Sequence, residues 1–598
     1  MRHLKNFVKK YFSSFAYFYS YLRNKIFIAF SLSILVSFLD GLGLTMFFPL
    51  LQVIGEGGSV NSEEMGPLGV VILGIEKLGI SLNLLSVLIV MVVFFTLKGI
   101  VTFLSNVYRI VLLQGFNRSM RINLLNLLNR ISYKKFITSD VGRIQNTMTG
   151  EVGRVSSAFS SYFNTFEQAL MIMVYMSFAF VANMQFAILV SIGGLSTNFL
   201  YKILYKKTLG VSRKLTRFNS VFQGQIIQHI THFKYLKATG YVNKYGERLK
   251  DTIYKIEESQ RKIGILASIA TSAREPMLVV IISIIIFIQV KFFGGAIGTI
   301  IISLLFFYRA LTSLMSMQQQ WNTFIAVSGS MENMQDFQKK LEEGKEKDGK
   351  IVVTSFEDKI VFDNVNFLYG DTPIINNVQL TIPKNKSYAL VGESGSGKTT
   401  MANLITGLLS ATNGAVRVDD NPMRTLKKES YQQRIGMVSQ DPVIFNDTIY
   451  NNVTLWAPKT EENLNRFQQS VEQASFNLFL NELPEGMETQ LGHNGINLSG
   501  GQKQRVSIAR ELFKDIDILI LDEATSSLDS ETEKEIQQNI DTLQGQYTII
   551  VIAHRLSTIR NVDKVIFMDK GSIIDMDSFY NLVKKQERFK RMVELQEL

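Results

Sequence analysis

The sequence predicts a chain of two unlike parts, an all-α transmembrane domain of six helices followed by an α/β domain. Long apolar runs are confined to the first 330 of the 598 residues. A stretch of mostly charged residues follows them. Beyond it, strand-like alternation leads into an apolar strand, a glycine-rich turn and a helix. A chain of this length also exceeds what one hydrophobic core accommodates.

Six apolar runs define the first part. They cover residues 26–54, 82–113, 162–181, 186–204, 263–290 and 296–327. Each holds about the 20 apolar residues that a bilayer-spanning helix needs, and six of them argue against buried soluble helices. The first run is too long for a signal-peptide core, and no small-residue cleavage site follows it.

An aromatic stretch precedes the first run. Its aromatic residues, which stand among lysines and an arginine, are Phe7, Tyr11, Phe12, Phe15, Tyr17, Phe18, Tyr19 and Tyr21. Aromatic and basic residues together are typical of the membrane interface. We therefore expect an interfacial elbow helix over residues 1–25.

Loop charges indicate the orientation. Residues 114–161 carry seven Lys or Arg against two acids, and residues 205–262 carry thirteen against four. Residues 55–81 carry four Glu and one Lys. Because basic loops stay in the cytoplasm, we expect a multi-pass protein of the bacterial inner membrane, with both termini and the two long basic loops inside. These loops account for much of the net charge of +11, so no nucleic-acid partner is expected.

The domain limits follow from these patterns. The membrane domain is expected over residues 26–330 and a charged linker over 331–354, where "KKLEEGKEKDGK" (339–350) has nine charged residues in twelve. The α/β domain is expected over residues 355–598. The chain has no cysteine, which excludes disulfides, thiolate metal sites and a cysteine nucleophile.

A phosphate-binding motif opens the α/β domain. In "SYALVGESGSGKTTMANLITGLL" (387–409) a strand leads through "GESGSGKT" into a helix, which is the context that makes a Walker A motif credible. Backbone N–H groups and the helix N-terminus attract phosphate. Lys398 is expected to reach the β- and γ-phosphates, and Thr399 to offer its hydroxyl to Mg²⁺. The predicted nucleotide contacts here are Gly392, Glu393, Ser394, Gly395, Ser396, Gly397, Lys398, Thr399 and Thr400.

A carboxylate pair supplies the second half of the site. "DIDILILDEAT" (515–525) is an apolar strand that ends in Asp522 and Glu523. Asp522 is placed to hold Mg²⁺ through water, and Glu523 to polarise the attacking water. Phosphoryl transfer depends mostly on such positioning and charge neutralisation.

The chain resembles the ATP-binding cassette (ABC) exporter family over essentially its whole length. "LSGGQ" (498–502) is similar to the family signature. The resemblance implies that Tyr369 stacks on adenine, that Gln440 senses Mg²⁺, that "SSLD" (526–529) is the D-loop, and that His554 contacts the γ-phosphate. It also implies that coupling helices lie in 140–155 and 232–240, on the nucleotide domain.

The resemblance implies a partner chain as well. In this family the signature turn closes over ATP bound by another nucleotide domain, so its residues Ser499, Gly500, Gly501 and Gln502 would contact that ATP. With one Walker A and one signature, the chain is expected to be a half-transporter that pairs with a second one, most simply itself. One departure is His493, which stands where exporters usually have Glu.

The expected function is ATP-driven export of an amphipathic substrate by alternating access, similar to flippases of lipids and lipid-linked oligosaccharides. A multidrug or peptide exporter is the main alternative, and an ATP-gated channel is a different class. Charges inside the apolar runs should face the bundle interior, pair, or line a wet cavity. Those that we propose for a substrate cavity are Asp40, Arg274, Glu275 and Arg309. Asp40 and Glu275 could hold the arginines when the cavity is empty; internal ion pairing is the alternative.

Overall fold

The computed structural model describes residues 14–47, 49–50, 53, 77, 83–182, 184–288, 291, 297–522, 530–553 and 555–596. Their contacts form two units. The first contains residues 1–131 and 138–345, and the second residues 132–137 and 346–598. Each unit is described separately.

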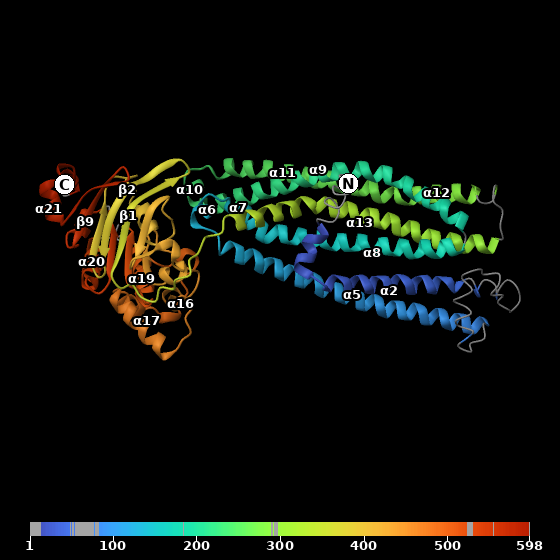
Figure 1. Ribbon diagram of the computed structural model, residues 1–598, viewed down its shortest axis with the longest axis horizontal. Helices are drawn as coiled ribbons and strands as arrows, with labels where there is room; N and C mark the ends of the chain where they lie inside the picture. The colour runs from blue at the N-terminus through green and yellow to red at the C-terminus, as the bar shows by residue number, and fades with distance from the viewer. Residues whose placement is uncertain are drawn as a thin grey trace. The chain divides into compact units, whose positions relative to one another are not determined.

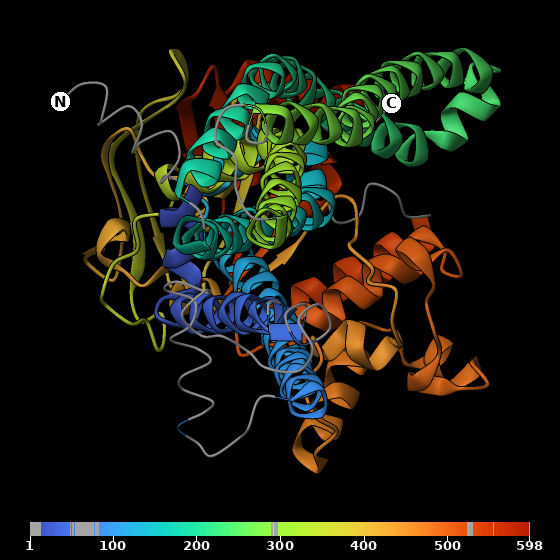
Figure 2. The same cartoon turned by 90° about the vertical axis from the view of Figure 1, so that its right-hand side faces the viewer.

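Long helices run side by side through the first unit (Figures 1 and 2). They are α2 (Lys25–Thr45), α5 (Leu84–Leu128), α8 (Val152–Ala182), α9 (Met184–Thr231), α11 (Val242–Ser272), α12 (Arg274–Ile288) and α13 (Ile297–Glu343). Shorter elements are α7 (Val141–Asn146), the π-helix η2 (Thr147–Glu151) and α10 (Phe233–Ala238). Among the described residues, the stretches long and apolar enough to cross a membrane are Lys25–Thr45, Leu84–Leu128 and Val242–Ile288. The expected all-α membrane domain is confirmed.

The segments expected as long cytoplasmic loops are largely helical. Helix α5 continues to Leu128 and α9 to Thr231. At 1.5 Å per residue, the 45 residues of α5 extend about 68 Å, roughly twice the hydrocarbon thickness of a bilayer. Similarly, α13 runs on to Glu343, so residues 331–343 of the expected linker are the last turns of this helix.

Aromatic side chains hold the elbow segment against the bundle. Residues 14–22 are helical, and the buried Phe18 ring lies 5.7 Å from the Phe116 ring and 5.2 Å from the Phe159 ring. Tyr19, by contrast, is exposed. Part of the aromatic stretch expected at the membrane interface therefore packs inside the protein, and Phe7, Tyr11 and Phe12 lie outside the described residues.

The second unit contains two sheets. The antiparallel sheet has the order β2-β1-β4-β5 and the larger sheet the order β10-β9-β3-β8-β7-β6. The strands are β1 (Lys359–Tyr369), β2 (Thr372–Pro383), β3 (Ser387–Val391), β4 (Asn413–Val418), β5 (Asn421–Pro422), β6 (Ile435–Val438), β7 (Ile518–Asp522), β8 (Thr548–Ile552), β9 (Lys564–Asp569) and β10 (Ser572–Asp577). Strands β9, β3, β8, β7 and β6 are parallel. The expected α/β domain is thus confirmed.

Helices surround these sheets (Figure 1). They are α14 (Lys398–Ile405), α15 (Lys428–Gln432), α16 (Ile449–Thr454), α17 (Glu461–Gln473), α18 (Asn477–Glu482), α19 (Gly500–Phe513), α20 (Ser530–Leu543), α21 (Phe579–Lys585) and α22 (Glu587–Gln596). Helix α14 contributes to one hydrophobic core, which both sheets share, and α19 contributes to another, which it forms with α16, α17 and α18.

A short helix from the first half of the chain belongs to the second unit. It is α6 (Tyr133–Ile137). Residues 140–155 are grouped with the first unit, and their expected contact with the α/β domain stays a prediction. In this segment Asp140 caps α7 by accepting from the Arg143 N–H at 3.1 Å. A Cβ at Gly142 would lie 2.4 Å from the Gly224 Cα atom, so α7 is seated closely on α9. Residues 232–240 also belong to the first unit.

Candidate functional site

Four sequence motifs follow neighbouring strands of the larger sheet. The phosphate-binding loop follows β3, position 554 lies just after β8, Asp522 ends β7, and Gln440 comes shortly after β6. These strands are adjacent and parallel, so their carboxyl ends meet at one edge, where α/β sheets bind ligands. The topology therefore brings together motifs that are up to 162 residues apart in sequence.

Glycines shape the phosphate-binding loop. Gly395 and Gly397 have φ angles of +82° and +102°, which a side chain would strain. A Cβ at Gly392 would lie 2.3 Å from the Met568 carbonyl oxygen. The loop runs from buried β3 directly into α14, whose N-cap is Gly397. Its backbone can therefore turn N–H groups toward an anion.

Lys398 is 5% exposed, at the start of α14. Its ammonium donates to the carbonyl oxygens of Gly392 (2.8 Å) and Glu393 (3.1 Å), so it lies inside the loop. The Ser396 hydroxyl is buried without a hydrogen-bond partner among the described residues, whereas Thr399 is exposed. A buried cation and an orphaned hydroxyl are what a phosphate group would satisfy.

The acidic half of the site is described in part. Asp522 is partly buried at the end of β7 and lies opposite Ile552 of β8. Glu523 and His554, together with residues 526–529, lie outside the described residues. The side chains expected to polarise water and to contact the γ-phosphate therefore remain sequence-based predictions.

Tyr369 is the last residue of β1 and is half-buried. Its ring meets the Phe367 ring edge to face at 4.9 Å. Burial raises the pKa of the Tyr369 hydroxyl, and Tyr133 in α6 adds to the increase. Gln440 lies in an exposed bend after β6. Both have the exposure that contact with a bound nucleotide requires.

The "LSGGQ" turn begins α19. The Ser499 hydroxyl accepts from the Gln502 N–H at 3.3 Å, and the Gln502 side chain accepts from the Ser499 N–H at 2.8 Å. This reciprocal capping box fixes the helix start. Ser499 and Gly500 are exposed, so the positive end of a 14-residue helix faces outward. The turn and the phosphate-binding loop thus stand on different cores of one unit.

Sequence reasoning missed Arg510, which lies in α19 and is 5% exposed. It donates from Nε to the Asn452 carbonyl (2.6 Å), and from its terminal nitrogens to the Val443 carbonyl (2.7 Å) and to Asn452 Oδ1 (3.0 Å). Burial lowers the pKa of its guanidinium from the ordinary value. These bonds tie the segment after Gln440 to the signature helix. An arginine among the apolar residues of "VSIARELF" was the available signal.

Charges in the membrane unit form pairs. The Asp40 carboxylate, 2% exposed in α2, pairs with the Lys98 ammonium of α5 and accepts from the Tyr175 hydroxyl of α8. Arg309 of α13 is exposed. Among the described residues, Asp40 thus has Lys98 and Tyr175 as partners, and its expected pairing with an arginine stays a prediction.

The other charges in the apolar runs do not belong to the Asp40 pair as far as the described residues show. Glu167 pairs with Arg109 at 3.1 Å. Glu275 is exposed at the start of α12. For Arg274, only the helical backbone is among the described features. The structure thus gives internal ion pairs to Asp40 and Glu167, the alternative left open by the sequence.

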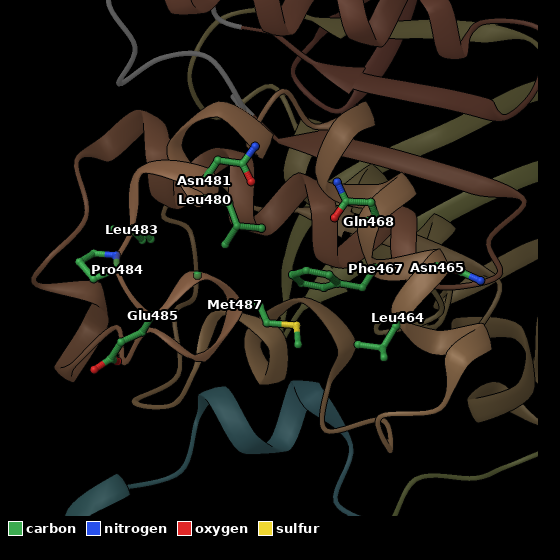
Figure 3. A pocket seen from close by; sticks show the side chains of 11 residues that line it. Leu464, Asn465, Phe467, Gln468, Leu480, Asn481, Leu483, Pro484, Glu485 and Met487 are labelled. Carbon is green, nitrogen blue, oxygen red and sulfur yellow. The ribbon is translucent and has the colours of Figure 1, made fainter.

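An open pocket of about 680 Å³ lies in the second unit, away from these motifs. Its lining comes from α17, α18 and the segment 483–487. Leu480, Phe467 and Met487 turn toward the same space, whereas Glu485 points away (Figure 3). The sequence-predicted site residues are absent from this lining.

Comparison with known proteins gives matches over both parts of the chain. Residues 375–526 match the ABC transporter family, and residues 26–318 match the ABC transporter transmembrane region. The heterocyst differentiation ATP-binding protein HepA of Nostoc sp. is 31% identical over 78% of this chain and 76% of its own. An ATP-dependent lipid A-core flippase of Psychrobacter arcticus is 28% identical over 84% of this chain and 85% of its own. The corresponding flippase of Vibrio cholerae is 31% identical over 64% and 67%.

A solved structure shares the fold. It is a bacterial Atm1-family ABC exporter with ATP bound, with a TM-score of 0.79 and 20% identity, and the match covers 96% of this chain and all of that one.

Proposed function

The chain belongs to the ABC transporter family, with a transmembrane region and an ATP-binding domain on one polypeptide, and from this premise we propose that it exports an amphipathic, lipid-linked substrate with an anionic headgroup. It is an ATPase coupled to transport. The proposal extends to its substrate, to the roles of its site residues and to its partner, which is a second copy of itself. We place the ATPase on the cytoplasmic side of the bacterial inner membrane.

Each residue of the ATP site has a role of its own, and most of these residues lie at one edge of the larger sheet. Lys398 and the loop N–H groups neutralise phosphate charge, and Glu523 orients the attacking water, with His554 at the γ-phosphate. Tyr369 supports the adenine. Mg²⁺, when bound, neutralises charge on the phosphate oxygens. The residues that would hold it are Thr399, Gln440 and Asp522, whose hydroxyl, amide and carboxylate oxygens are of the kind that this ion prefers.

Two features support pairing with a second copy. The exposed start of α19 presents Ser499 and Gly500 as an anion-binding helix end, and it stands on a different core from the phosphate-binding loop. The tip formed by α10 also exposes apolar area, since Phe233 and Tyr235 are 48% and 68% exposed. Exposed aromatics of this kind mark protein contacts. In a two-fold dimer each signature turn would close the other chain's site.

The exposed Arg309 carries the substrate proposal. Asp40 is nearly sealed and pairs with Lys98, whereas Arg309 is exposed on α13. An arginine in a membrane unit is costly unless it pairs or lines a wet cavity, and its planar fork suits a phosphate or carboxylate. The flippases to which this chain is similar are named for lipid A-core, an amphiphile.

The test uses purified protein in lipid nanodiscs, with ATPase measured against a phosphate-bearing glycolipid and a hydrophobic cation. The variant Arg274→Ala/Arg309→Ala should lose stimulation by the glycolipid and keep basal ATPase. Lys291→Ala is the matched control, because this lysine lies over the Phe287 ring instead. If the double variant responds like wild type and Asp40→Asn alone removes stimulation by cations, the multidrug alternative is correct. Flux without proportional ATP turnover would indicate a channel.

A further inference from the structure

Helix α6 lies early in the chain but belongs to the ATP-binding unit. Its flanking residues, Ile131 and Thr138, belong to the membrane unit, yet residues 132–137 are grouped with the ATP-binding unit. The helix has five residues, and its side chains lie beside the end of strand β1.

Lys134 makes two contacts with the end of β1. Its ammonium donates to the Leu368 carbonyl at 3.1 Å and lies 5.3 Å from the centre of the Phe367 ring. That carbonyl belongs to the peptide bond that leads into Tyr369. The Phe367 ring in turn meets the Tyr369 ring edge to face. Lys134 therefore touches the two residues that precede Tyr369 and orient it.

The end of β1 is only irregularly held by its neighbouring strand β2. The pairing of β1 with β2 is irregular between Val365 and Phe367 and again between Phe367 and Leu368. After Tyr369 the chain turns through Gly370, at a φ of +59°. The Leu368 N–H is held from another side by the Thr412 hydroxyl at 3.1 Å. The carbonyl of the same residue is held by Lys134, through a charge-assisted bond that is stronger than a neutral one.

We propose that Lys134 is a positioning residue for nucleotide-base recognition: by holding the Leu368 carbonyl and the Phe367 ring, it sets the Tyr369 ring against the adenine. The inference rests on the proposed role of Tyr369. Tyr133, whose hydroxyl influences Tyr369 electrostatically, belongs to the same contact.

The experiment measures ATPase kinetics and nucleotide binding of the full chain in nanodiscs. Lys134→Met keeps most of the aliphatic stem and removes the ammonium. We expect the KM for ATP to rise up to about tenfold, the loss of one charge-assisted hydrogen bond, with kcat unchanged. Binding of inorganic tripolyphosphate, which has no base, should be unaffected. Lys134→Arg should restore the KM, and Lys135→Met is the matched neighbouring control.

The possible outcomes distinguish the role of Lys134 from the role of Tyr369 on which it rests. If Tyr369→Ala leaves the KM for ATP unchanged, the role of Tyr369 is wrong, and the inference is overturned with it. If Tyr369→Ala raises the KM while Lys134→Met behaves like Lys135→Met, only the inference is overturned. An equal loss of ATP and tripolyphosphate binding in Lys134→Met would also overturn it, because Lys134 would then act on the phosphate site.

Discussion

Arg510 of the signature helix donates two hydrogen bonds to Asn452, from Nε to the backbone oxygen at 2.6 Å and from a terminal nitrogen to Oδ1 at 3.0 Å. Asn452 is fully buried, and its amide donates to the Phe445 carbonyl at 3.0 Å. The segment that follows Gln440 is therefore fastened to the helix that begins at Ser499. Two parts of the ATP machinery that belong to different strands and helices are held as one body.

Replacing Arg510 by Met should destabilise the ATP-binding unit by about 2–5 kcal/mol, because it leaves buried carbonyl groups unpaired. Thermal unfolding followed by the fluorescence of Trp456, which belongs to this unit, measures the loss. Arg588→Met is the control: this arginine pairs with Asp569 and Glu393 at the surface, where ion pairs add little. Equal unfolding temperatures for the two variants would contradict the role of Arg510.

The Asp40–Lys98 pair should behave as a buried ion pair. Lys98→Met removes the ammonium that pairs with the buried Asp40 carboxylate, and we expect a loss of about 3 kcal/mol. Asp40→Asn combined with Lys98→Met should recover most of it, since the buried carboxylate is then replaced by a neutral amide. The fraction of protein that stays monodisperse after heating in detergent provides the measurement. Additive losses in the double variant would show that the two residues are uncoupled.

The proposed roles of Glu523 and Lys398 predict that one variant loses ATP hydrolysis and the other loses ATP binding. Glu523→Gln should bind ATP, lose nearly all turnover and accumulate a closed, ATP-loaded dimer, because only water activation is removed. Lys398→Ala should instead weaken nucleotide binding, since it removes charge from the β- and γ-phosphates. Equilibrium binding and steady-state ATPase distinguish them. Near-normal turnover in Glu523→Gln would exclude its proposed role.

If the ATP site is shared between two chains, as proposed, mixed dimers should contain one damaged and one intact site. When Lys398→Ala chains assemble with Ser499→Arg chains, both lesions fall in the same site if the signature serves the partner, and the other site stays intact. Counting occluded ATP in purified mixed dimers tests this. One ATP per dimer is expected, whereas none would show that each signature serves its own chain.

Acid should weaken the contact between β3 and β9. Burial alone would raise the pKa of Asp563, but hydrogen bonds from the Ser387 N–H (2.8 Å) and hydroxyl (2.9 Å), with the Lys386 ammonium, hold it below its usual range. A carboxyl with a lowered folded-state pKa contributes stability that is complete above its unfolded value, about 3.9. That contribution is lost as the pH falls through the folded value. Asp563→Asn should therefore flatten the fall of the unfolding temperature below about pH 4. An unchanged slope would contradict this assignment.

Local patterns made much of the fold and site predictable. Apolar runs long enough for a bilayer, and a strand that leads through glycines into a helix at Lys398, report their structure directly, because each depends on neighbours in the chain. Features that depend on contacts between distant parts of the chain were harder to predict from the sequence. The helices that continue beyond the bilayer, such as α5 to Leu128, have polar ends that read as loops. The close seating of α7 on α9 at Gly142 and Gly224 likewise depends on residues far apart in the chain.

The sequence by itself determined the two-part architecture, the phosphate-binding loop and the Asp522 strand end, since periodicity and short-range turn chemistry specify them. Only the tertiary structure decided which side chains meet. Asp40 meets Lys98 and Tyr175 because α2, α5 and α8 bring these three polar side chains together. Arg510 reaches Asn452, and Lys134 the end of β1, across 58 and 234 residues. Such contacts are set by packing between distant elements, and no local pattern encodes them.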